Sequence, residues 1–418
     1  MLEQQVNQII GHLFRHEAGK MAAVLTRLLG FQSLDLAEDI VQDTLLTALS
    51  VWKYKGIPEN PPAWLYKVAK RKAIDSLRQN QVHHQHHDHI ANALRSEWTL
   101  TPTVNSFFLE DEIEDSQLRM MFACCHPSIP YESQIALTLK TLCGLSTLEI
   151  ANCFLTNEET ITKRLYRARE KIREGNISLE SPLPATLPGR TDAVLHTLYL
   201  LFNEGYNSSH PDRLIRNDLC EDAIRLTLLL TKSKLTDSAK VKALLALMCF
   251  QASREDARID SDGSIKLLKD QDRSLWNQDL IEKGKYYLES SADGDEYSEY
   301  HIEAAIAGCH AAVLSFEGTD WTRMVALYEI LALMKPGPII ELNKAIAIGY
   351  SKSPQEGLDA LNTITTLKDH YLYHAARGDF FVSMGNLESA KSCYEESLRL
   401  TRSNAEKNLL HQKLRSLN

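Results

Sequence analysis

A basic helix face between residues 160 and 171 carries the most specific chemical signal in this sequence. Apolar residues recur there at helical spacing, at positions 161, 165, 168 and 172. The opposite side of the same predicted helix presents Thr160, Lys163, Arg164, Arg167 and Lys171. Arginine and lysine pair with guanine edges in the major groove and with backbone phosphates. This face therefore predicts a DNA-reading helix.

Two helix-start signals position this face. Ser146 and Glu149 have the spacing of a capping box, and Thr156 and Glu159 repeat it ten residues later. The pattern predicts short helices that start near residues 147 and 157, the first ending near Cys153. Two helices joined by a tight turn, with the second basic on its outward side, form a helix-turn-helix unit. An ordinary helical hairpin without DNA contacts is the alternative.

A second basic helix is predicted over residues 61–78. It starts with two prolines, which suit the first turn of a helix. Leu65, Val68, Ala69 and Ala73 share one side, whereas the other side carries basic residues: Lys67, Lys70, Arg71 and Arg78. A row of cations opposite an apolar stripe suits a helix that packs on its domain and contacts DNA phosphates. A solvated charged face is an equally good interpretation.

An acidic helix is predicted before it, over residues 36–53. One broad apolar side is formed by Leu36, Ile40, Thr44, Leu45, Ala48 and Trp52. The other side gathers Glu38, Asp39, Gln42 and Asp43 around the projecting residues Leu46 and Leu49. Acidic groups around an exposed leucine suit a protein docking surface. Acids near a helix N-terminus also stabilise the helix dipole, so a purely structural role is the alternative.

Cysteines and histidines give a weaker signal for metal binding. The eight cysteines show no CxxC spacing, and Cys124, Cys125 and His126 have no second ligand pair at finger-like spacing. We interpret the thiols as buried apolar groups, and the histidine run at 83–89 as part of a linker. A metalloenzyme is the competing hypothesis. Neither a Ser/His/Asp arrangement, a glycine-rich phosphate loop nor an HExxH motif is present, so we expect no enzyme, no metal and no cofactor.

Composition narrows the class of protein. The 418 residues are 44% hydrophobic and 24% charged, which is ordinary for a soluble globular protein of two to three domains. The most apolar stretch, 193–202, is far shorter than the roughly 20 residues of a membrane span, and the N-terminus lacks a secretion signal. We therefore expect a cytoplasmic protein without membrane contacts. Residues 1–190 carry 20 basic and 22 acidic side chains. Residues 191–418 carry 26 basic and 33 acidic side chains and are therefore the more acidic part.

Helical periodicity runs along the whole chain and predicts an all-α fold. Two polar stretches, 81–106 and the proline-containing 176–190, are expected to be linkers. They separate helical units at 1–80, 107–175 and 191–418. The last unit contains a repeat at an offset of 33 residues, in which Ala345, Ile348, Gly357 and Leu361 match Gly378, Phe381, Ala390 and Tyr394. This period is typical of tetratricopeptide-type hairpins, expected at about 338–400.

The combination of these helices resembles the extracytoplasmic-function (group IV) RNA polymerase sigma factors of the sigma-70 family. Residues 35–44 and 62–78 resemble region two of that family, and residues 149–151 and 160–169 resemble region four. Further segments resemble a subgroup whose C-terminal extension ends in tetratricopeptide-like helices: 122–127, 202–206, 270–276, 304–307, 319–321 and 342–345.

The resemblance implies a bacterial alternative sigma factor whose partners are core RNA polymerase and promoter DNA. Region two then docks on the clamp helices of the largest subunit through Asp35, Glu38, Asp39, Gln42, Asp43 and Leu46. The flap of the second subunit is a further implied contact. The implied contacts with the −10 element are Trp64, Lys67, Lys70, Arg71, Ile74, Asp75 and Arg78. The implied contacts with the −35 element are Thr160, Lys163, Arg164, Arg167 and Lys171. The fused extension is expected to control activity and to bind a regulatory protein or ligand.

A DNA-binding regulator is the alternative function. It has the same helix-turn-helix unit, uses the tetratricopeptide-like repeats as a sensor and does not replace sigma. This alternative leaves the acidic helix and the basic helix at 61–78 unexplained. Dependence of promoter binding on polymerase distinguishes the two functions.

Overall fold

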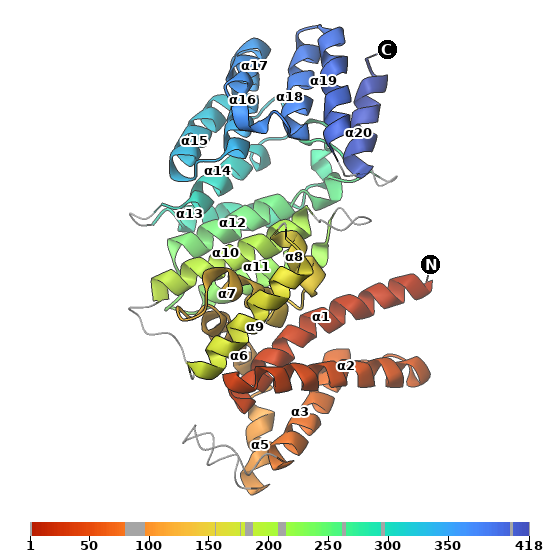
Figure 1. The fold of residues 1–418 in the computed structure, drawn as a ribbon, viewed down its shortest axis with the longest axis vertical. Coiled ribbons are helices and arrows are strands. Elements are labelled where there is room, and N and C mark those ends of the chain that lie inside the picture. The colour runs from red at the N-terminus through yellow and green to blue at the C-terminus, as the bar shows by residue number, and fades with distance from the viewer. Residues whose placement is uncertain are drawn as a thin grey trace. The chain divides into compact units, whose positions relative to one another are not determined.

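A computed structural model describes residues 2–79, 97–154, 156–175, 177–179, 187–207, 215–260, 265–293, 297–401 and 404–417. Within these residues the chain is helical (Figure 1), and the β-structure is limited to one isolated bridge between Ile259 and Ile265. The predicted all-α fold is thus confirmed. No helix in the described part of the chain is long and apolar enough to cross a membrane.

The chain divides into two compact units. The first comprises residues 1–204 and 221–236, and the second comprises residues 205–220 and 237–418. The division therefore falls within α10 (Leu187–Tyr206) and α11 (Asn217–Lys232). This differs from the expected boundary near residue 190, because α10 up to residue 204 and most of α11 fold with the first unit.

Four helices of the first unit enclose one apolar core. They are α1 (Leu2–Leu29), α2 (Leu34–Lys55), α3 (Pro61–Gln79) and α5 (Glu97–Ser106). Leu25, Leu65 and Leu100 are completely buried in this core. Helices α2 and α3 confirm the two helices that the periodicity predicted over 36–53 and 61–78.

Helix α5 replaces the last part of the expected linker at 81–106. Leu100 and Val104, one helical turn apart, are both fully buried. The free energy gained by burying these two side chains outweighs the free-energy cost of placing Pro102 inside the helix. The rest of that linker, with its histidine run, lies outside the described residues. In the second expected linker, Pro188 already lies in the first turn of α10, where proline is tolerated.

The remaining helices of the first unit follow in sequence: α6 (Glu110–Cys124), α7 (Tyr131–Thr141), α8 (Thr147–Cys153) and α9 (Glu158–Glu174). Helix α6 packs along α1, and α9 packs on α7. Gly19 of α1 allows an especially close approach, because a Cβ atom there would overlap the backbone carbonyl of Leu142.

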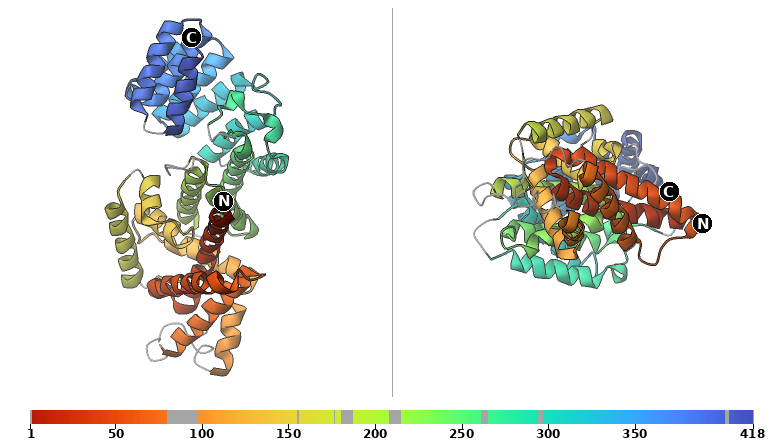
Figure 2. Two further views of the ribbon diagram at one scale, coloured as in Figure 1. Left: turned by 90° about the vertical axis from the view of Figure 1, so that its right-hand side faces the viewer. Right: turned by 90° about the horizontal axis from the view of Figure 1, so that it is seen from below.

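After residues 205–220, the second unit continues with α12 (Ala239–Ala252), α13 (Gln278–Ser290), α14 (Glu299–Ala311) and α15 (Trp321–Met334). Two hairpins follow, α16 (Pro338–Ser351) with α17 (Pro354–Asn362), and α18 (Tyr371–Ser383) with α19 (Leu387–Leu400). The chain then forms α20 (Asn404–Arg415), beside α19 (Figure 2).

The 33-residue offset read from the sequence relates these two hairpins to each other. Gly349 and Gly357 lie against the Phe380 ring, and Gly378 lies against the Tyr394 ring. Small residues thus let neighbouring helices approach closely at each hairpin, and three of the residues in these contacts, Gly357, Gly378 and Tyr394, belong to the repeat.

Candidate nucleic-acid interface

A groove between α3 and α5 collects the basic residues predicted on 61–78. Its volume is about 490 Å³, and it is lined by Ala63, Lys67, Lys70, Arg71, Ile74, Asp75, Arg78, Thr101 and Asn105. Lys67, Arg71 and Arg78 are exposed, whereas Lys70 is partly buried beside the Phe108 ring, 5.3 Å from its centroid. Burial lowers the pKa of Lys70. Six of the seven residues expected at the −10 element line this groove; Trp64 does not.

The second wall of the groove was not anticipated from the sequence. Thr101 and Asn105 lie on α5, in a stretch that was expected to be a linker. Their neutral hydrogen-bonding groups face four basic side chains, a combination suited to phosphates and base edges. No signal in the sequence marks these two residues, because only the burial of Leu100 and Val104 brings α5 against α3.

The two aromatic residues at the start of α3 pack inward. Trp64 is half-buried, with its ring centroid 5.5 Å from that of Trp52, and it borders the core of the first unit. Tyr66 packs on Phe108 at a centroid distance of 5.7 Å. These contacts favour a structural role for Trp64 in the core, and its role in DNA binding stays a prediction.

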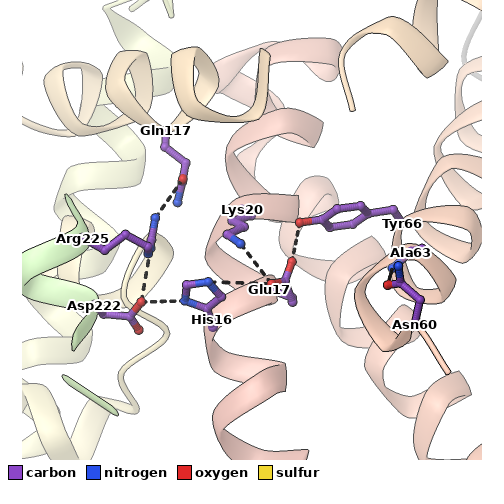
Figure 3. Close-up of polar contacts among 9 residues, drawn as sticks. All are labelled: His16, Glu17, Lys20, Asn60, Ala63, Tyr66, Gln117, Asp222 and Arg225. Atoms are coloured by element: carbon purple, nitrogen blue, oxygen red, sulfur yellow. Dashed lines mark hydrogen bonds and ion pairs between the residues drawn. The ribbon is translucent and has the colours of Figure 1, made fainter. Parts of the chain in front are cut away.

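Glu17 on α1 is a buried carboxylate that ties α3 to α1. Only 3% of its surface is exposed. It accepts a hydrogen bond from the Tyr66 hydroxyl and another, of 3.0 Å, from Lys20 Nζ (Figure 3). Burial, together with the Glu17 charge, raises the pKa of Tyr66, which keeps the hydroxyl protonated as a donor.

Asp222 on α11 continues this polar network to two other helices (Figure 3). His16 Nδ1 on α1 lies 2.8 Å from Asp222 Oδ1. Arg225 donates to Asp222 at 3.2 Å and to the Gln117 side chain of α6 at 3.1 Å. Burial raises the pKa of Asp222, but the hydrogen bond from His16 and the charge of Arg225 outweigh it, so the pKa lies below its ordinary value.

The acidic face of α2 is present as predicted. Asp39, Gln42 and Asp43 are exposed, and Leu46 projects from the same face with 62% of its surface exposed. Leu49, next to it, is 49% exposed. Asp43 also lies 3.6 Å from the ammonium group of Lys72 on α3. This face offers an apolar anchor surrounded by negative charge.

Two further acids of α2 are engaged within the first unit. Arg169 on α9 places its Nε 2.8 Å from Asp35 Oδ1 and its Nη2 2.7 Å from Glu38 Oε2. Burial raises the pKa of Glu38, and the nearby Arg169 charge offsets this only in part. No pattern in the sequence marks Arg169 as a partner of the acids on α2. Its position 131 residues from Glu38 left no local signal to find it.

Helices α8 and α9 follow each other in the chain, as the two helix-start signals predicted. The predicted capping box at the start of α8 is confirmed, with Ser146 and Glu149 bonding reciprocally. The second predicted cap is wrong by one residue. Asn157, not Thr156, caps α9, and its side chain accepts a 2.9 Å bond from the Thr160 backbone N–H.

The residues expected at the −35 element share one side of α9, but they are not equally available. Lys163, Arg167 and Lys171 are exposed. Arg164 is only 17% exposed, because it pairs with Glu132 of α7 and lies over the Phe154 ring. The expectation that Arg164 faces outward is therefore corrected, since the carboxylate and the ring together hold its guanidinium inside the unit.

The two thiols of the Cys124–His126 segment lie in the core. Cys124 and Cys125 are buried beside the hydroxyls of Thr141 and Thr138, and burial raises the pKa of Cys125 to about 12. His126 instead turns to Ser128, at 2.7 Å. Across the residues that the structure describes, no cluster of three or more His, Cys, Asp or Glu side chains is arranged to hold a metal ion. The contacts thus favour the structural interpretation of these thiols.

Comparisons with known proteins identify two segments. Residues 13–82, which contain most of α1 and all of α2 and α3, match the family model described as Sigma-70 region 2. Residues 190–292 match a family of unknown function, DUF6596. An uncharacterised protein of Rhizobium meliloti (strain 1021) is 32% identical over 373 residues, covering 88% of this chain and 87% of that protein. No solved structure matches the chain.

Two named relatives match part of the chain. The RNA polymerase sigma factor SigV of Bacillus subtilis (strain 168) is 30% identical over 139 residues, 33% of this chain and 75% of the relative. The ECF RNA polymerase sigma-E factor of Haemophilus influenzae is 29% identical over 155 residues, 37% of this chain and 79% of the relative. With the region 2 match on the helices that carry the acidic face and the basic groove, the chain belongs to the sigma-70 family of RNA polymerase sigma factors.

Proposed function

We propose that this sigma factor directs core RNA polymerase to a distinct set of promoters by reading −10 and −35 elements. The observation that carries the proposal is the α3–α5 groove, where the predicted −10 residues gather around one cavity. A strand separated from its duplex offers phosphates to the cations of the groove and base edges to Thr101 and Asn105. No catalytic role is proposed.

The acidic face of α2 is the proposed surface for docking on core polymerase. Leu46 supplies the apolar anchor, and Asp39 and Asp43 supply charge that steers a basic partner into register. We assign this face to the clamp helices of the largest subunit, following the family resemblance. Contact of region four with the flap of the second subunit is proposed on the same basis.

Helix α9 is the proposed reader of the −35 element. Lys163, Arg167 and Lys171 are exposed on one side of it, where they can reach base edges and phosphates. Lys163 pairs with Glu159 and Lys171 with Glu174, at 2.7 and 2.9 Å. Such exposed pairs are weak enough for DNA to replace them.

Run-off transcription with purified core polymerase on a genomic fragment library tests the proposal. The double variant Lys67→Gln/Arg71→Gln removes two exposed cations of the groove. We expect it to lower specific transcripts at least tenfold while leaving affinity for core polymerase unchanged. The matched control, Lys53→Gln/Lys55→Gln, removes two exposed lysines at the end of α2. Equal transcription by both double variants would contradict the assignment of the groove.

Dependence on polymerase distinguishes this function from a free-standing helix-turn-helix regulator. A sigma factor needs little promoter affinity of its own, because polymerase supplies most of the binding and aligns both DNA-reading units. We therefore expect promoter-specific footprints only when polymerase is present. A specific footprint of the protein alone, with no transcript from the core enzyme, would favour the regulator.

We propose that the C-terminal extension controls activity through residues 221–236, and that its paired hairpins are tetratricopeptide-like. Asp222 and Arg225 connect α11 to α1 and to α6.

A truncation near residue 178 would also remove helices that belong to the first unit, so a point variant of the full chain is the better test. Asp222→Asn should raise polymerase-dependent transcription if the network holds the unit closed. The exposed control Asp256→Asn should not. If Asp222→Asn supports transcription only at the wild-type level or below it, residues 221–236 do not regulate activity in this way.

A further inference from the structure

Two arginines of the second unit share one tryptophan. Arg254 follows α12, and Arg273 begins the 3-10 helix Arg273–Leu275. The guanidinium carbons of Arg254 and Arg273 lie 5.4 and 4.6 Å from the centroid of the Trp276 ring, so they are no more than about 10 Å apart. Trp276 is 3% exposed and both arginines are partly buried. An aromatic face in this position holds cations in place and excludes water from one side.

Neither arginine meets a carboxylate among the residues that the structure describes. Arg254 Nε contacts the neutral side-chain oxygen of Gln271 at 3.4 Å. Arg273 donates one terminal nitrogen to the backbone carbonyls of His310 and Val313. Its other terminal nitrogen, Nη2, is buried without an acceptor. Partly buried charges are ordinarily paired, so this arrangement leaves positive charge and donor capacity unmatched.

The positive charges of the two arginines also repel each other. Burial, and then the charge of Arg254, lowers the pKa of Arg273. Burial and both arginines lower the pKa of His310 to about 3, so the imidazole is neutral and adds no charge of its own. Glu317, whose charge acts on Arg273 from a distance, is exposed to solvent. An anion bound by both guanidinium groups would offset their repulsion and supply the acceptor that Arg273 Nη2 lacks.

We propose that Arg254, Gln271, Arg273 and Trp276 form a binding site for a small molecule that carries an oxyanion, either a carboxylate or a phosphate group. The planar guanidinium fork matches both groups in a bidentate manner. Trp276 and Gln271 hold the forks before the ligand arrives, which reduces the entropy lost on binding. The site belongs to the extension, so it gives that part of the chain a ligand to sense. The proposal does not depend on the sigma-factor assignment.

Isothermal titration of the full chain with sodium phosphate, and separately with sodium succinate, tests the site at constant ionic strength maintained with chloride. We expect saturable binding of one anion per chain, and the tighter of the two identifies the preferred group. Arg254→Gln should raise the dissociation constant at least tenfold. Lys285→Gln, which removes a charge of the same sign from an exposed position on α13, should leave it unchanged. The proposal is overturned if neither anion binds saturably. It is also overturned if wild type and Arg254→Gln bind the anion with equal affinity.

A second measurement needs no variant and therefore does not depend on the folding of Arg254→Gln. Phenylglyoxal modifies arginine side chains, and peptide mass spectrometry reports the extent at each position. The bound anion should slow modification of Arg254 at least threefold and leave the exposed Arg399 unaffected. Equal slowing at both positions would indicate general screening by the salt and would contradict a site.

Discussion

Substitution of Arg169 by glutamine should loosen the first unit and strengthen binding to core polymerase at the same time. Arg169 is 22% exposed and contacts Glu38, which is 19% exposed, at 2.7 Å. A charged hydrogen bond in such a place contributes about 1.5–3 kcal/mol. The second contact, to Asp35, adds little, because the carboxylate of that residue is 58% exposed. The substitution should therefore lower the free energy of unfolding by about 2 kcal/mol.

The gain in affinity follows from the same contacts. Asp35 and Glu38 belong to the proposed docking surface, so polymerase has to displace Arg169 in order to reach them. Removing the pair removes this competition, and about 2 kcal/mol corresponds to an increase in affinity of up to about 30-fold. Fluorescence anisotropy of the labelled chain titrated with core polymerase measures the affinity, and urea unfolding measures the stability.

The matched control is Arg173→Gln, which removes the same charge from an exposed position of α9. It should change neither quantity by more than about 0.5 kcal/mol. If Arg169→Gln loses stability as expected but binds core polymerase no more tightly than wild type, the competition between Arg169 and polymerase does not exist.

Three further substitutions test contacts within the units, two in the first unit and one in the second. Tyr66→Phe leaves the buried Glu17 without its hydroxyl donor and should lower the free energy of unfolding in urea by about 1–3 kcal/mol. Gly19→Ala forces a Cβ atom against the Leu142 carbonyl and should destabilise the first unit by at least about 2 kcal/mol, measured in the same way. His310 should make stability depend on pH, since its pKa is about 3 in the fold and about 6.5 when unfolded. The unfolded chain then binds a proton that the folded chain does not, so lowering the pH from 7.5 to 5 should remove about 2 kcal/mol, a loss absent from His310→Gln.

Each of these substitutions has a control with the same chemistry at an exposed or open position. Tyr54→Phe alters a tyrosine that is 83% exposed. Gly11→Ala adds a Cβ atom where no other atom lies within 4 Å. His411→Gln alters an exposed histidine of α20. Equal destabilisation by a substitution and its control would refute the contact in question, and a pH profile unchanged by His310→Gln would refute the buried neutral imidazole.

Local patterns in the sequence determined the helices and their faces. The caps and apolar spacing that predicted α2, α3, α8 and α9 act within one or two turns, so they can be read without the fold. The exposed Leu46 on the acidic face and the buried Leu65 stripe followed from the same periodicity. The chemistry of both helices could thus be predicted, together with the family that they resemble.

Only the tertiary structure decided which of these groups meet. Arg164 turns inward because Glu132 lies beside it, and Arg169 reaches an acid 131 positions earlier. Helix α5 became a wall of the groove because Leu100 and Val104 had an apolar surface to cover, despite a composition that suggested a linker. Contacts of this kind depend on the burial of apolar area between segments distant in the chain, and local propensity carries no information about their partners.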